Sequence, residues 1–494
     1  NVILRLNQSA LCSLVSRQVK SLGSINKKER KKTMEKILLN GTRFINESGR
    51  EVILHGMNVL CRDAALGHFY PDFENAFPFF QRMGFNLLRF GIFWHGVEPR
   101  PGVYDETYLG RVKEIVNLAE SCGIYIILDM HQDLFAQKYI DGAPDWACLD
   151  DGLPHPESCT IWYNAYLESD AIIRAADNFW ANKPAEDGAG LLDHYSSMWE
   201  KIAETFADCS NVIGFEPMNE PFMGSIAREA FGYATRKMME TNPAFDLTKP
   251  EAVTEEEQAA FMGIVSQRFL EFDRTTLMDY YRRMQRAIRK YSDKPIVTGG
   301  NIYCSTNIPT GIERLEEGNQ IYAPHGYDSV VDSARYESFS KRNVELLYEE
   351  KRRGQERLGL PTIVGEWGAF PSEKFTNDLI RHMNGILEKN LWGSAYCEYH
   401  PGMESDANFS SLCRTYPAET AGKLEMYRYD EDVQRFEMIF EAEGSGETRI
   451  FCSFIPQGVE CNLPHSFRIE QLSDRSCCCF LKTDIAGRAC VVVK

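Results

Sequence analysis

The chain has 494 residues and a formal net charge of -17 at pH 7. This length is enough for one large domain and one small domain. The acidic balance argues against nucleic acid as a partner and against charge-driven binding to anionic membranes. No segment has the run of about 18 apolar residues that a transmembrane helix needs, so we expect at most peripheral contact with a membrane. We also expect the protein to be a monomer.

Residues 1–33 differ in composition from the rest of the chain. They contain no acidic residue before Glu29, they carry scattered Arg, Lys and Ser, and they lack an apolar core followed by a small-residue cleavage site. This is not the pattern of a secretory signal. A transit peptide and an extension upstream of a start at Met34 both fit the composition. We expect this N-terminal arm to be poorly ordered.

From residue 34 to residue 425 the chain alternates short apolar runs with longer segments of helical spacing. Leu109, Val112, Val116 and Ala119 show that spacing in one such segment. The alternation predicts an α/β fold, a (β/α)8 TIM barrel. The eight predicted strands are residues 52–57, 86–92, 124–130, 212–218, 295–299, 320–323, 361–365 and 392–397.

Polar side chains gather at the predicted carboxyl ends of these strands, where TIM barrels perform their chemistry. They are Arg89 in strand two, His131 and Asp133 after strand three, and His325 and Tyr327 after strand six. A single histidine or arginine is more often a structural hydrogen-bonding group. Five such residues on one face favour a substrate site.

Two glutamates end predicted strands four and seven. Glu220 follows Asn219 in FEPMNEPF, and Glu366 lies in PTIVGEWGAF. Solvated loop glutamates are the ordinary alternative. A retaining glycosidase, however, needs one carboxylic acid to protonate the leaving oxygen and one carboxylate about 5 Å away to attack the anomeric carbon. We expect Arg89 and Tyr327 to keep Glu366 ionised as the nucleophile, and Glu220, buried without such partners, to stay protonated as the acid.

Two long insertions follow predicted strands three and four, at about residues 134–187 and 222–273. Insertions of this length are usually functional or disordered. The first contains Trp146, Trp162 and Trp180, and its aromatic content argues against disorder. These rings fit either an apolar wall for a lipid chain, with Trp146 binding substrate, or simple packing of the insertion onto the barrel. The second insertion contains KPEAVTEEEQ, which predicts the start of a solvated helix.

Beyond Arg428 the pattern changes to short alternating runs separated by Gly, Pro and Asn. Residues 426–494 are therefore predicted to form a small antiparallel β-sandwich domain. This segment contains no binding motif, and we expect it to be structural.

The chain has 15 cysteines, and Cys477, Cys478 and Cys479 are consecutive. This does not fit an ordinary disulfide framework. We therefore expect a reducing, cytoplasmic compartment, although Cys148 and Cys159 flank one loop and are candidates to pair in an exported protein. No phosphate-binding glycine loop or zinc-ligand spacing occurs, so we expect no cofactor, no metal, and activity that survives chelation.

The glutamate pair, Arg89 and the step His325-Gly326-Tyr327 resemble glycoside hydrolase family 5. A finer resemblance to the endoglycoceramidases covers most of residues 40–425, in VEPRPGVYDETYL, ILDMHQDLF, GAPDWACLDDGLP, AADNFWANKP, MNEPFMGS and TYPAETAGKL. This resemblance implies a barrel followed by a β-sandwich, and metal-free cleavage, with retention, of the bond between the oligosaccharide and the ceramide of glycosphingolipids.

The resemblance also implies roles for individual residues. Glu220 would be the acid/base, Glu366 the nucleophile and Asn219 the partner of the sugar 2-hydroxyl, and the ligands of the reducing-end glucose would be His131, Asp133 and His325. One departure is visible at the end of the last strand, where members usually carry a tryptophan beneath the sugar. Here GSAYCEYHPG places Cys397 or Glu398 at that point, with Tyr396 and Tyr399 nearby as replacement rings.

Three classes of function remain open. The first is a retaining endo-glycosidase acting on a glycolipid, and the second is an intracellular exo-acting β-glucosidase on simple lipid glucosides such as glucosylceramide. An inactive sugar-binding barrel is the third and is disfavoured because both glutamates are present. An endo-β-glucanase or mannanase is a weaker alternative. The first two differ in how many sugars fit on the glycone side, which depends on loop shape.

Overall fold

The computed structural model describes residues 34–494 except residues 160, 247–252, 329, 332 and 334, so the predicted N-terminal arm lies outside the described residues. Within the described part of the chain, no helix combines the length and the apolar character needed to cross a membrane. The described cysteines are all free, and these include Cys148 and Cys159.

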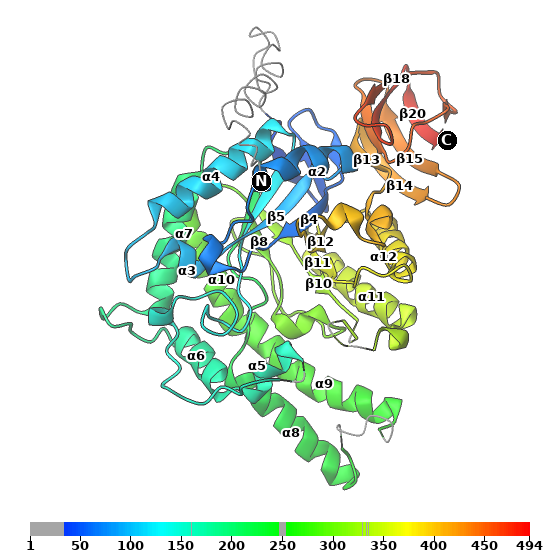
Figure 1. Ribbon diagram of the computed structural model, residues 1–494. Coiled ribbons are helices and arrows are strands. Elements are labelled where there is room, and N and C mark those ends of the chain that lie inside the picture. The colour runs from blue at the N-terminus through cyan, green and yellow to red at the C-terminus, as the bar shows by residue number, and fades with distance from the viewer. Residues whose placement is uncertain (1–33, 160, 247–252, 329, 332, 334) are drawn as a thin grey trace, which may run out of the picture. The chain divides into compact units, whose positions relative to one another are not determined.

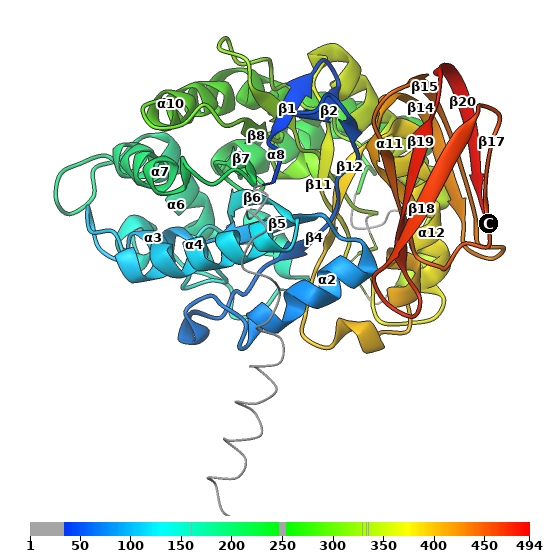
Figure 2. The same cartoon turned by 90° about the horizontal axis from the view of Figure 1, so that it is seen from above.

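A parallel sheet surrounded by helices forms the core of the fold (Figures 1 and 2). Its strands pair in the order β10-β11-β12-β4-β5-β6-β7-β8-β9, and a bridge between Tyr322 in β9 and Thr362 joins the two ends of the sheet. The predicted barrel is confirmed, and β10 continues the line of β9. The strands are β4 (His55–Val59), β5 (Leu87–Ile92), β6 (Tyr125–Met130), β7 (Val212–Glu216), β8 (Ile296–Thr298), β9 (Gln320–Tyr322), β10 (His325–Gly326), β11 (Ile363–Gly368) and β12 (Gly393–Cys397).

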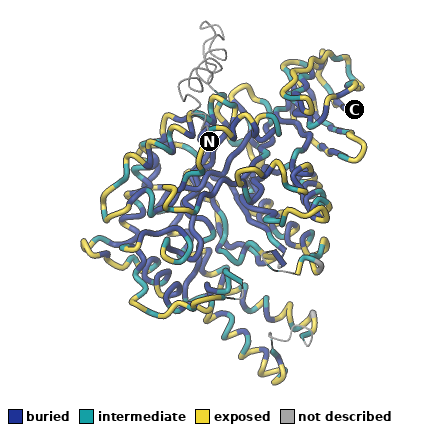
Figure 3. Tube along the Cα trace, viewed as in Figure 1, coloured by how far each residue is buried: buried dark blue, intermediate teal, exposed yellow. Residues whose placement is uncertain are grey.

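The continuous apolar runs of the sequence reflect burial of the strands on both faces. Every residue of β5, β6 and β11 is buried, and Figure 3 shows the barrel strands as a buried centre. Helices cover the outer face of a parallel barrel, and side chains from the strands fill its interior. Charged residues within these strands therefore have to be paired inside the protein.

The helices connect successive strands or extend the two insertions. They are α2 (Phe77–Met83), α3 (Trp94–Val97), α4 (Glu106–Ser121), α5 (Ala165–Glu168), α6 (Asp170–Trp180), α7 (Leu191–Phe206), α8 (Ser225–Thr241), α9 (Glu255–Phe272), α10 (Met278–Ile288), α11 (Lys341–Leu358) and α12 (Thr376–Asn390). Helix α9 begins after Thr254 with a reciprocal capping box to Glu257, as the acidic sequence predicted.

One connection departs from the predicted alternation of strand and helix. Residues 299–319, between β8 and β9, contain only the 3-10 turn η7 (Ile302–Ser305). Asp273, in the π-helix η6 (Asp273–Leu277), accepts hydrogen bonds from two points of this loop, at Asn301 and Gly311. These long-range bonds take the place of the local hydrogen bonds of a helix.

Two antiparallel sheets share a second hydrophobic core and confirm the predicted β-sandwich. The seven-stranded sheet has the order β1-β2-β3-β13-β16-β19-β18, and the four-stranded sheet has the order β14-β15-β20-β17. The strands are β1 (Ile37–Asn40), β2 (Arg43–Asn46), β3 (Glu51–Val52), β13 (Tyr416–Thr420), β14 (Gly422–Asp430), β15 (Arg435–Glu443), β16 (Thr448–Cys452), β17 (Val459–Cys461), β18 (His465–Gln471), β19 (Cys477–Thr483) and β20 (Ala486–Val493). The sheets thus begin before residue 426 and recruit residues 37–52, because β3 pairs with β13.

Candidate active site

Arg89, in β5, is completely buried at the centre of the candidate site. Burial alone would lower its pKa, but the charges of Asp129, Glu216 and Glu366 hold the pKa of Arg89 well above its ordinary value. Its guanidinium donates at 2.7–2.9 Å to Glu216, Glu366, Asn58 and Asn219. Arg89 therefore fixes four side chains from β4, β7 and its end, and β11 in one arrangement.

Glu366, in β11, is buried and accepts the two hydrogen bonds that the sequence predicted. Arg89 donates to Oε1 at 2.8 Å and the Tyr327 hydroxyl donates to Oε2 at 2.8 Å. Burial by itself raises the pKa of this carboxyl, but the charges of His325, Arg89 and His131 and the bond from Tyr327 outweigh it and lower the pKa of Glu366 to about 2. Glu366 is thus an ionised carboxylate at neutral pH.

Glu220 follows β7 in a left-handed backbone conformation, with φ of 39°. Gln132 holds this turn by donating to the carbonyls of Asn219 and Glu220. The expectation that Glu220 lacks polar partners is wrong. Its Oε1 accepts from the Ser305 hydroxyl at 2.5 Å and lies 2.9 Å from Nδ1 of His325. These partners come from the β8–β9 loop and from β10, which the sequence did not place beside Glu220.

His325 lies between the two glutamates. Its Nδ1 is 2.9 Å from Glu220 Oε1 and 3.6 Å from Glu366 Oε2. Burial would lower its pKa, but the charge of Glu366 and the bond and charge of Glu220 raise the pKa of His325. One oxygen of each glutamate and one nitrogen of His325 all lie within 4.8 Å of one another. A carboxylate separation of about 5 Å is that of retaining glycosidases.

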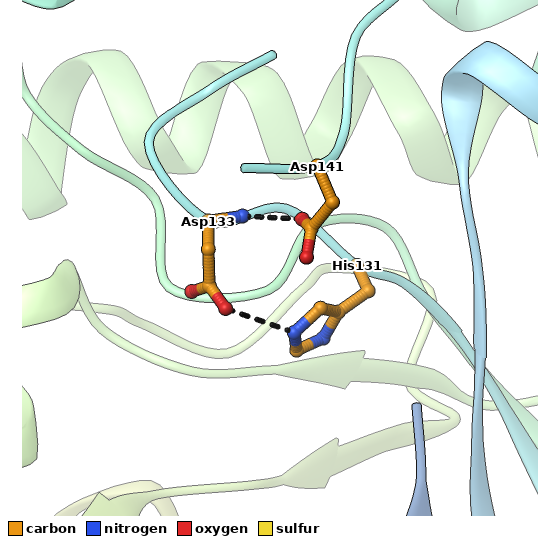
Figure 4. A group of neighbouring side chains, drawn as sticks. All are labelled: His131, Asp133 and Asp141. Atoms are coloured by element: carbon orange, nitrogen blue, oxygen red, sulfur yellow. Dashed lines mark hydrogen bonds and ion pairs between the residues drawn. The ribbon is translucent and has the colours of Figure 1, made fainter. Parts of the chain in front are cut away.

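His131, Asp133 and Asp141 form a second polar group beside the glutamates, with their side chains directed toward one another (Figure 4). His131 pairs through Nδ1 with Asp129 at 2.8 Å, and its Nε2 lies 3.5 Å from Asp133. Burial would lower the pKa of His131, but Asp129 and Asp133 raise it well above the ordinary value. Burial and the nearby Asp133 raise the pKa of Asp141 to about 7.

The sequence shows no zinc-ligand spacing, but the fold brings possible metal ligands together. In the described part of the chain, His131, Asp133 and Asp141 form one such group, and Glu220, His325 and Glu366 form another. In the first group a cation is already present, because the Arg62 guanidinium lies 3.2–3.3 Å from Asp133 and Asp141. In the second, the raised pKa of His325 favours the protonated ring, which has no lone pair for a metal.

A cleft of about 710 Å³ opens beside both glutamates and is mainly apolar. Its polar part includes His131, Asp133, Glu220, Tyr327 and Glu366. Its apolar part draws on the first insertion, the β8–β9 loop and the segments after β11 and β12. The apolar residues are Ile140, Trp162, Tyr163, Tyr166, Ile302, Tyr303, Phe370, Met403 and Leu412. The arrangement combines a carboxylate pair with a large apolar wall.

Trp146 is not among the residues that line this cleft. Its indole donates to the Glu98 carbonyl at 3.1 Å, and its ring packs edge-on against Trp94 and His194. Trp180 likewise packs inward, donating to the Phe222 carbonyl. Trp162 of the first insertion therefore lines the cleft, while Trp146 and Trp180 attach the insertion to the barrel.

Arg89 and Asn219 are fully buried and do not line the cleft either. Asn219 accepts from Arg89 at 2.9 Å and donates to the Gln132 carbonyl at 3.1 Å, so its amide has one fixed orientation. Sequence reasoning missed Asn58, Asp129, Glu216 and Ser305. Asp129 and Glu216 had a detectable signal, because each is an acidic residue inside an apolar strand run.

At the end of β12, where a tryptophan was expected from the resemblance, the chain has a charge pair. Cys397 and Glu398 both line the cleft, and Glu398 receives two hydrogen bonds from Arg62, at 2.8 and 3.0 Å. Tyr396 also lines the cleft, with its ring 5.1 Å from that of Trp367. Tyr399 instead packs against Tyr70 and Phe80.

The chain is similar to several endoglycoceramidases. An endoglycoceramidase from Cyanea nozakii is 31% identical over 286 residues, which are 51% of this chain and 56% of that protein. An endoglycoceramidase from Hydra vulgaris is 26% identical and spans 86% of this chain and 82% of its own length. Endo-glycoceramidase II from Rhodococcus sp., at 24% identity and a TM-score of 0.72, shares the fold over 91% of this chain and 98% of its own. Structures of that enzyme include a ganglioside GM3 complex and a lactosyl-enzyme intermediate.

The family model described as Cellulase (glycosyl hydrolase family 5) matches residues 45–391. That range includes both glutamates and all barrel strands except β12. The chain therefore belongs to glycosyl hydrolase family 5 and is a glycoside hydrolase.

Proposed function

We propose that this glycoside hydrolase cleaves the bond between the sugar and the ceramide of glycosphingolipids, with retention of configuration. The observation that carries the proposal is the cleft, in which a close carboxylate pair adjoins a wall of apolar side chains from four segments. Sugar hydroxyls suit the polar end, and two hydrocarbon chains suit the apolar wall. The endoglycoceramidase relatives support this substrate class.

In the first step the ionised Glu366 attacks the anomeric carbon, and the bond from that carbon to the ceramide oxygen breaks. Glu220 gives its proton to the departing oxygen. Both hydrogen bonds to the Glu220 carboxyl from described residues use Oε1, so Oε2 is the oxygen left to present the proton. In the second step Glu220 takes a proton from water, the water oxygen bonds to the anomeric carbon, and Glu366 leaves.

Buried polar atoms beside the glutamates support a sugar at this point. His131 Nε2 is buried and makes no hydrogen bond with any described residue. Its contact with Asp133 is a long ion pair, so a sugar hydroxyl would give this nitrogen a hydrogen bond of ordinary length. Asp133 lies 3.5 Å away and offers an acceptor to the same or a neighbouring hydroxyl.

The test is a panel of glucosylceramide, lactosylceramide, a ganglioside and a soluble β-glucan, followed by identification of the released sugar. We expect intact oligosaccharide and ceramide from the lipids and no cleavage of the β-glucan. Cleavage of the β-glucan alone would assign the chain to the polysaccharide-degrading members of the family.

An exo-acting β-glucosidase on lipid glucosides is the second candidate. The Arg62–Glu398 pair favours it, because this charged pair lines the cleft at the strand end where a flat ring was expected beneath the sugar. Release of glucose from glucosylceramide, with no product from lactosylceramide, would select this candidate.

A further inference from the structure

The β8–β9 loop carries the only hydroxyl that hydrogen-bonds the Glu220 carboxyl among the described residues. We propose that Lys351 and Ser305 are positioning residues for the acid/base, with Lys351 fixing the loop so that the Ser305 hydroxyl orients Glu220. This inference rests on the proposed function, because it assigns a means of orientation to the acid in that reaction.

Lys351, in α11, is almost completely buried, with 2% of its surface exposed. Its ammonium donates to the carbonyls of Cys304 and Thr306, the two residues that flank Ser305. Among the described residues, Lys351 forms no ion pair with a carboxylate within 4 Å. Burying an ammonium ion is costly. Both hydrogen-bond acceptors of Lys351 among the described residues are carbonyls of the turn that carries Ser305.

Burial lowers the pKa of Lys351 to about 8, so the side chain remains mostly charged at pH 7. The charge strengthens both hydrogen bonds to the turn, because a charged donor binds a carbonyl more strongly than a neutral one. The carbonyls of residues 304 and 306 are thereby held toward α11, and the orientation of Ser305 between them is fixed.

Asp273 holds the same loop near its start and near its middle. Its carboxylate, with no exposed surface, accepts from the backbone and side chain of Asn301 at 3.2 and 2.8 Å and from the backbone of Gly311 at 2.8 Å. It lies in the π-helix η6, a geometry often found next to functional sites. Asp273 and Lys351 therefore both hold this loop, in which the structure has a 3-10 turn and no α-helix.

The turn also connects the two glutamates. The Ser305 carbonyl accepts from the backbone of Tyr327 at 3.0 Å, and the Tyr327 hydroxyl donates to Glu366. Ser305 contacts Glu220 directly and Glu366 only through Tyr327. A displacement of Ser305 would therefore disturb the orientation of Glu220 more than that of Glu366. Proton donation by an acid matters greatly for poor leaving groups and little for activated ones.

The test compares Ser305→Ala and Lys351→Met on two aryl β-glycosides of the sugar that the wild type accepts best, one with a 2,4-dinitrophenyl and one with a 4-methoxyphenyl leaving group. We expect kcat/KM to fall about 10- to 100-fold for 4-methoxyphenyl and less than about 3-fold for 2,4-dinitrophenyl. The double variant should be no worse than the more affected single variant, because both act through one contact. Lys341→Met is the matched control, since Lys341 lies on the same helix in an exposed pair with Asp378.

Glu220→Gln is measured beside these variants. If it shows the leaving-group dependence and neither positioning variant does, the inference is wrong and the acid assignment stands. Equal losses on both substrates, or additive losses in the double variant, would reduce Lys351 and Ser305 to a general structural role. If Glu220→Gln itself shows no such dependence, the acid assignment fails and the inference falls with it. Ser305→Ala, a deletion of one hydroxyl at the cleft, keeps the test decisive if Lys351→Met does not fold.

Discussion

Glu220 and Glu366 are the same type of residue in one cleft, and their neighbours give them different properties. Arg89 and Tyr327 donate to the two oxygens of Glu366, whereas the hydrogen-bond partners that Glu220 has among the described residues both meet Oε1. A carboxylate that is hydrogen-bonded on both oxygens is stabilised in its charged form. A carboxyl with one oxygen unoccupied retains a position from which to transfer a proton.

Glu220→Gln should separate the two steps of the reaction. The variant cannot protonate the leaving oxygen, so we expect cleavage of natural lipid glycosides to be lost, with a decrease of about 10²- to 10⁴-fold. Formation of the glycosyl-enzyme from an activated aryl glycoside should continue, because that leaving group needs no proton. Pre-steady-state release of the phenolate measures this step. Equal impairment on both substrate types would remove Glu220 from the acid role.

Glu366 should be labelled by a 2-fluoro glycoside that carries a good leaving group. The reagent reacts with the ionised nucleophile to form a glycosyl-enzyme. This glycosyl-enzyme hydrolyses slowly, so the label stays on the nucleophile. Peptide mapping should place the label on Glu366, and the first sugar released from a natural substrate should keep its β configuration. An α-anomer as first product would indicate inversion and a larger separation of the carboxylates than this cleft has.

The stability of the protein at acid pH should also depend on Glu366. Its pKa in the folded state is about 2, below the ordinary value of 4.5. A depressed folded-state pKa contributes stability that is fully present above the unfolded-state pKa and is lost as pH falls through the folded-state pKa. We therefore expect Glu366→Gln to be less stable than wild type above about pH 5, and the difference to shrink toward pH 2. Urea unfolding at several pH values measures it, and a difference that widens as pH falls would contradict this account.

Part of the site was predictable from sequence because barrel geometry brings strand ends together. The strand count placed Arg89 and Tyr327 next to Glu366, and both hydrogen bonds are present. The contact between Ser305 and Glu220 was not predictable, because Ser305 lies in a loop without periodicity, 85 residues away in the sequence. The contacts of Arg62 with Asp133, Asp141 and Glu398 were missed for the same reason.

At the scale of elements, a buried ion pair joins the barrel to the β-sandwich. Glu388 of α12 accepts two hydrogen bonds from Arg414, and its second oxygen accepts from the backbone of Tyr429 in β14. Burial raises the pKa of Glu388, and the charge and hydrogen bonds of Arg414 oppose that rise. The pair therefore connects a barrel helix to the first strand of the four-stranded sheet.

Arg414→Met should lower the free energy of unfolding by about 3–5 kcal/mol, because it leaves the buried Glu388 without its counter-charge. Arg428→Met is the matched control on β14, where the exposed pair with Glu437 should contribute less than about 1 kcal/mol. Denaturant unfolding measures both variants. Neither residue lines the cleft, so activity per folded molecule should be unchanged. Similar losses in the two variants would show that burial of the pair is not decisive.

The apolar periodicity of the sequence predicted which elements exist. It did not predict the residues at which they begin and end. All eight predicted strand regions overlap a barrel strand, because burial on both faces leaves a continuous apolar run. The predicted first strand, 52–57, instead spans the end of β3 and the start of β4. Two adjacent strands of different sheets give one apolar run when both are buried. Only the pairing of Val52 with Glu419, far away in sequence, separates them.

At the scale of the whole molecule, the sandwich draws strands from both ends of the described chain. Strands β1 to β3 precede the barrel, and they join the rest of the seven-stranded sheet only through the pairing of β3 with β13. The Tyr416 hydroxyl donates to the carbonyl of Gly84, which ends α2. Any side chain at Gly84 would collide with the ring of Phe451 in β16. The antiparallel sheets thus pack closely on a barrel helix.

This packing makes a prediction about the barrel in isolation. A chain ending at residue 425 would retain β13 and the start of β14 but lose β16 and β15, which pair with them. It would also expose Ile53 and Tyr416, which belong to the second hydrophobic core. Buried apolar surface contributes about 25 cal/mol per Å², so removing most of a core is incompatible with a net stability of only about 5–15 kcal/mol. We expect residues 34–425 to be insoluble or to lack a cooperative unfolding transition, and limited proteolysis of the full chain not to release them intact. A soluble fragment 34–425 with full activity would show instead that the barrel is stable without the sandwich, and that the contacts at Gly84 and Tyr416 are dispensable.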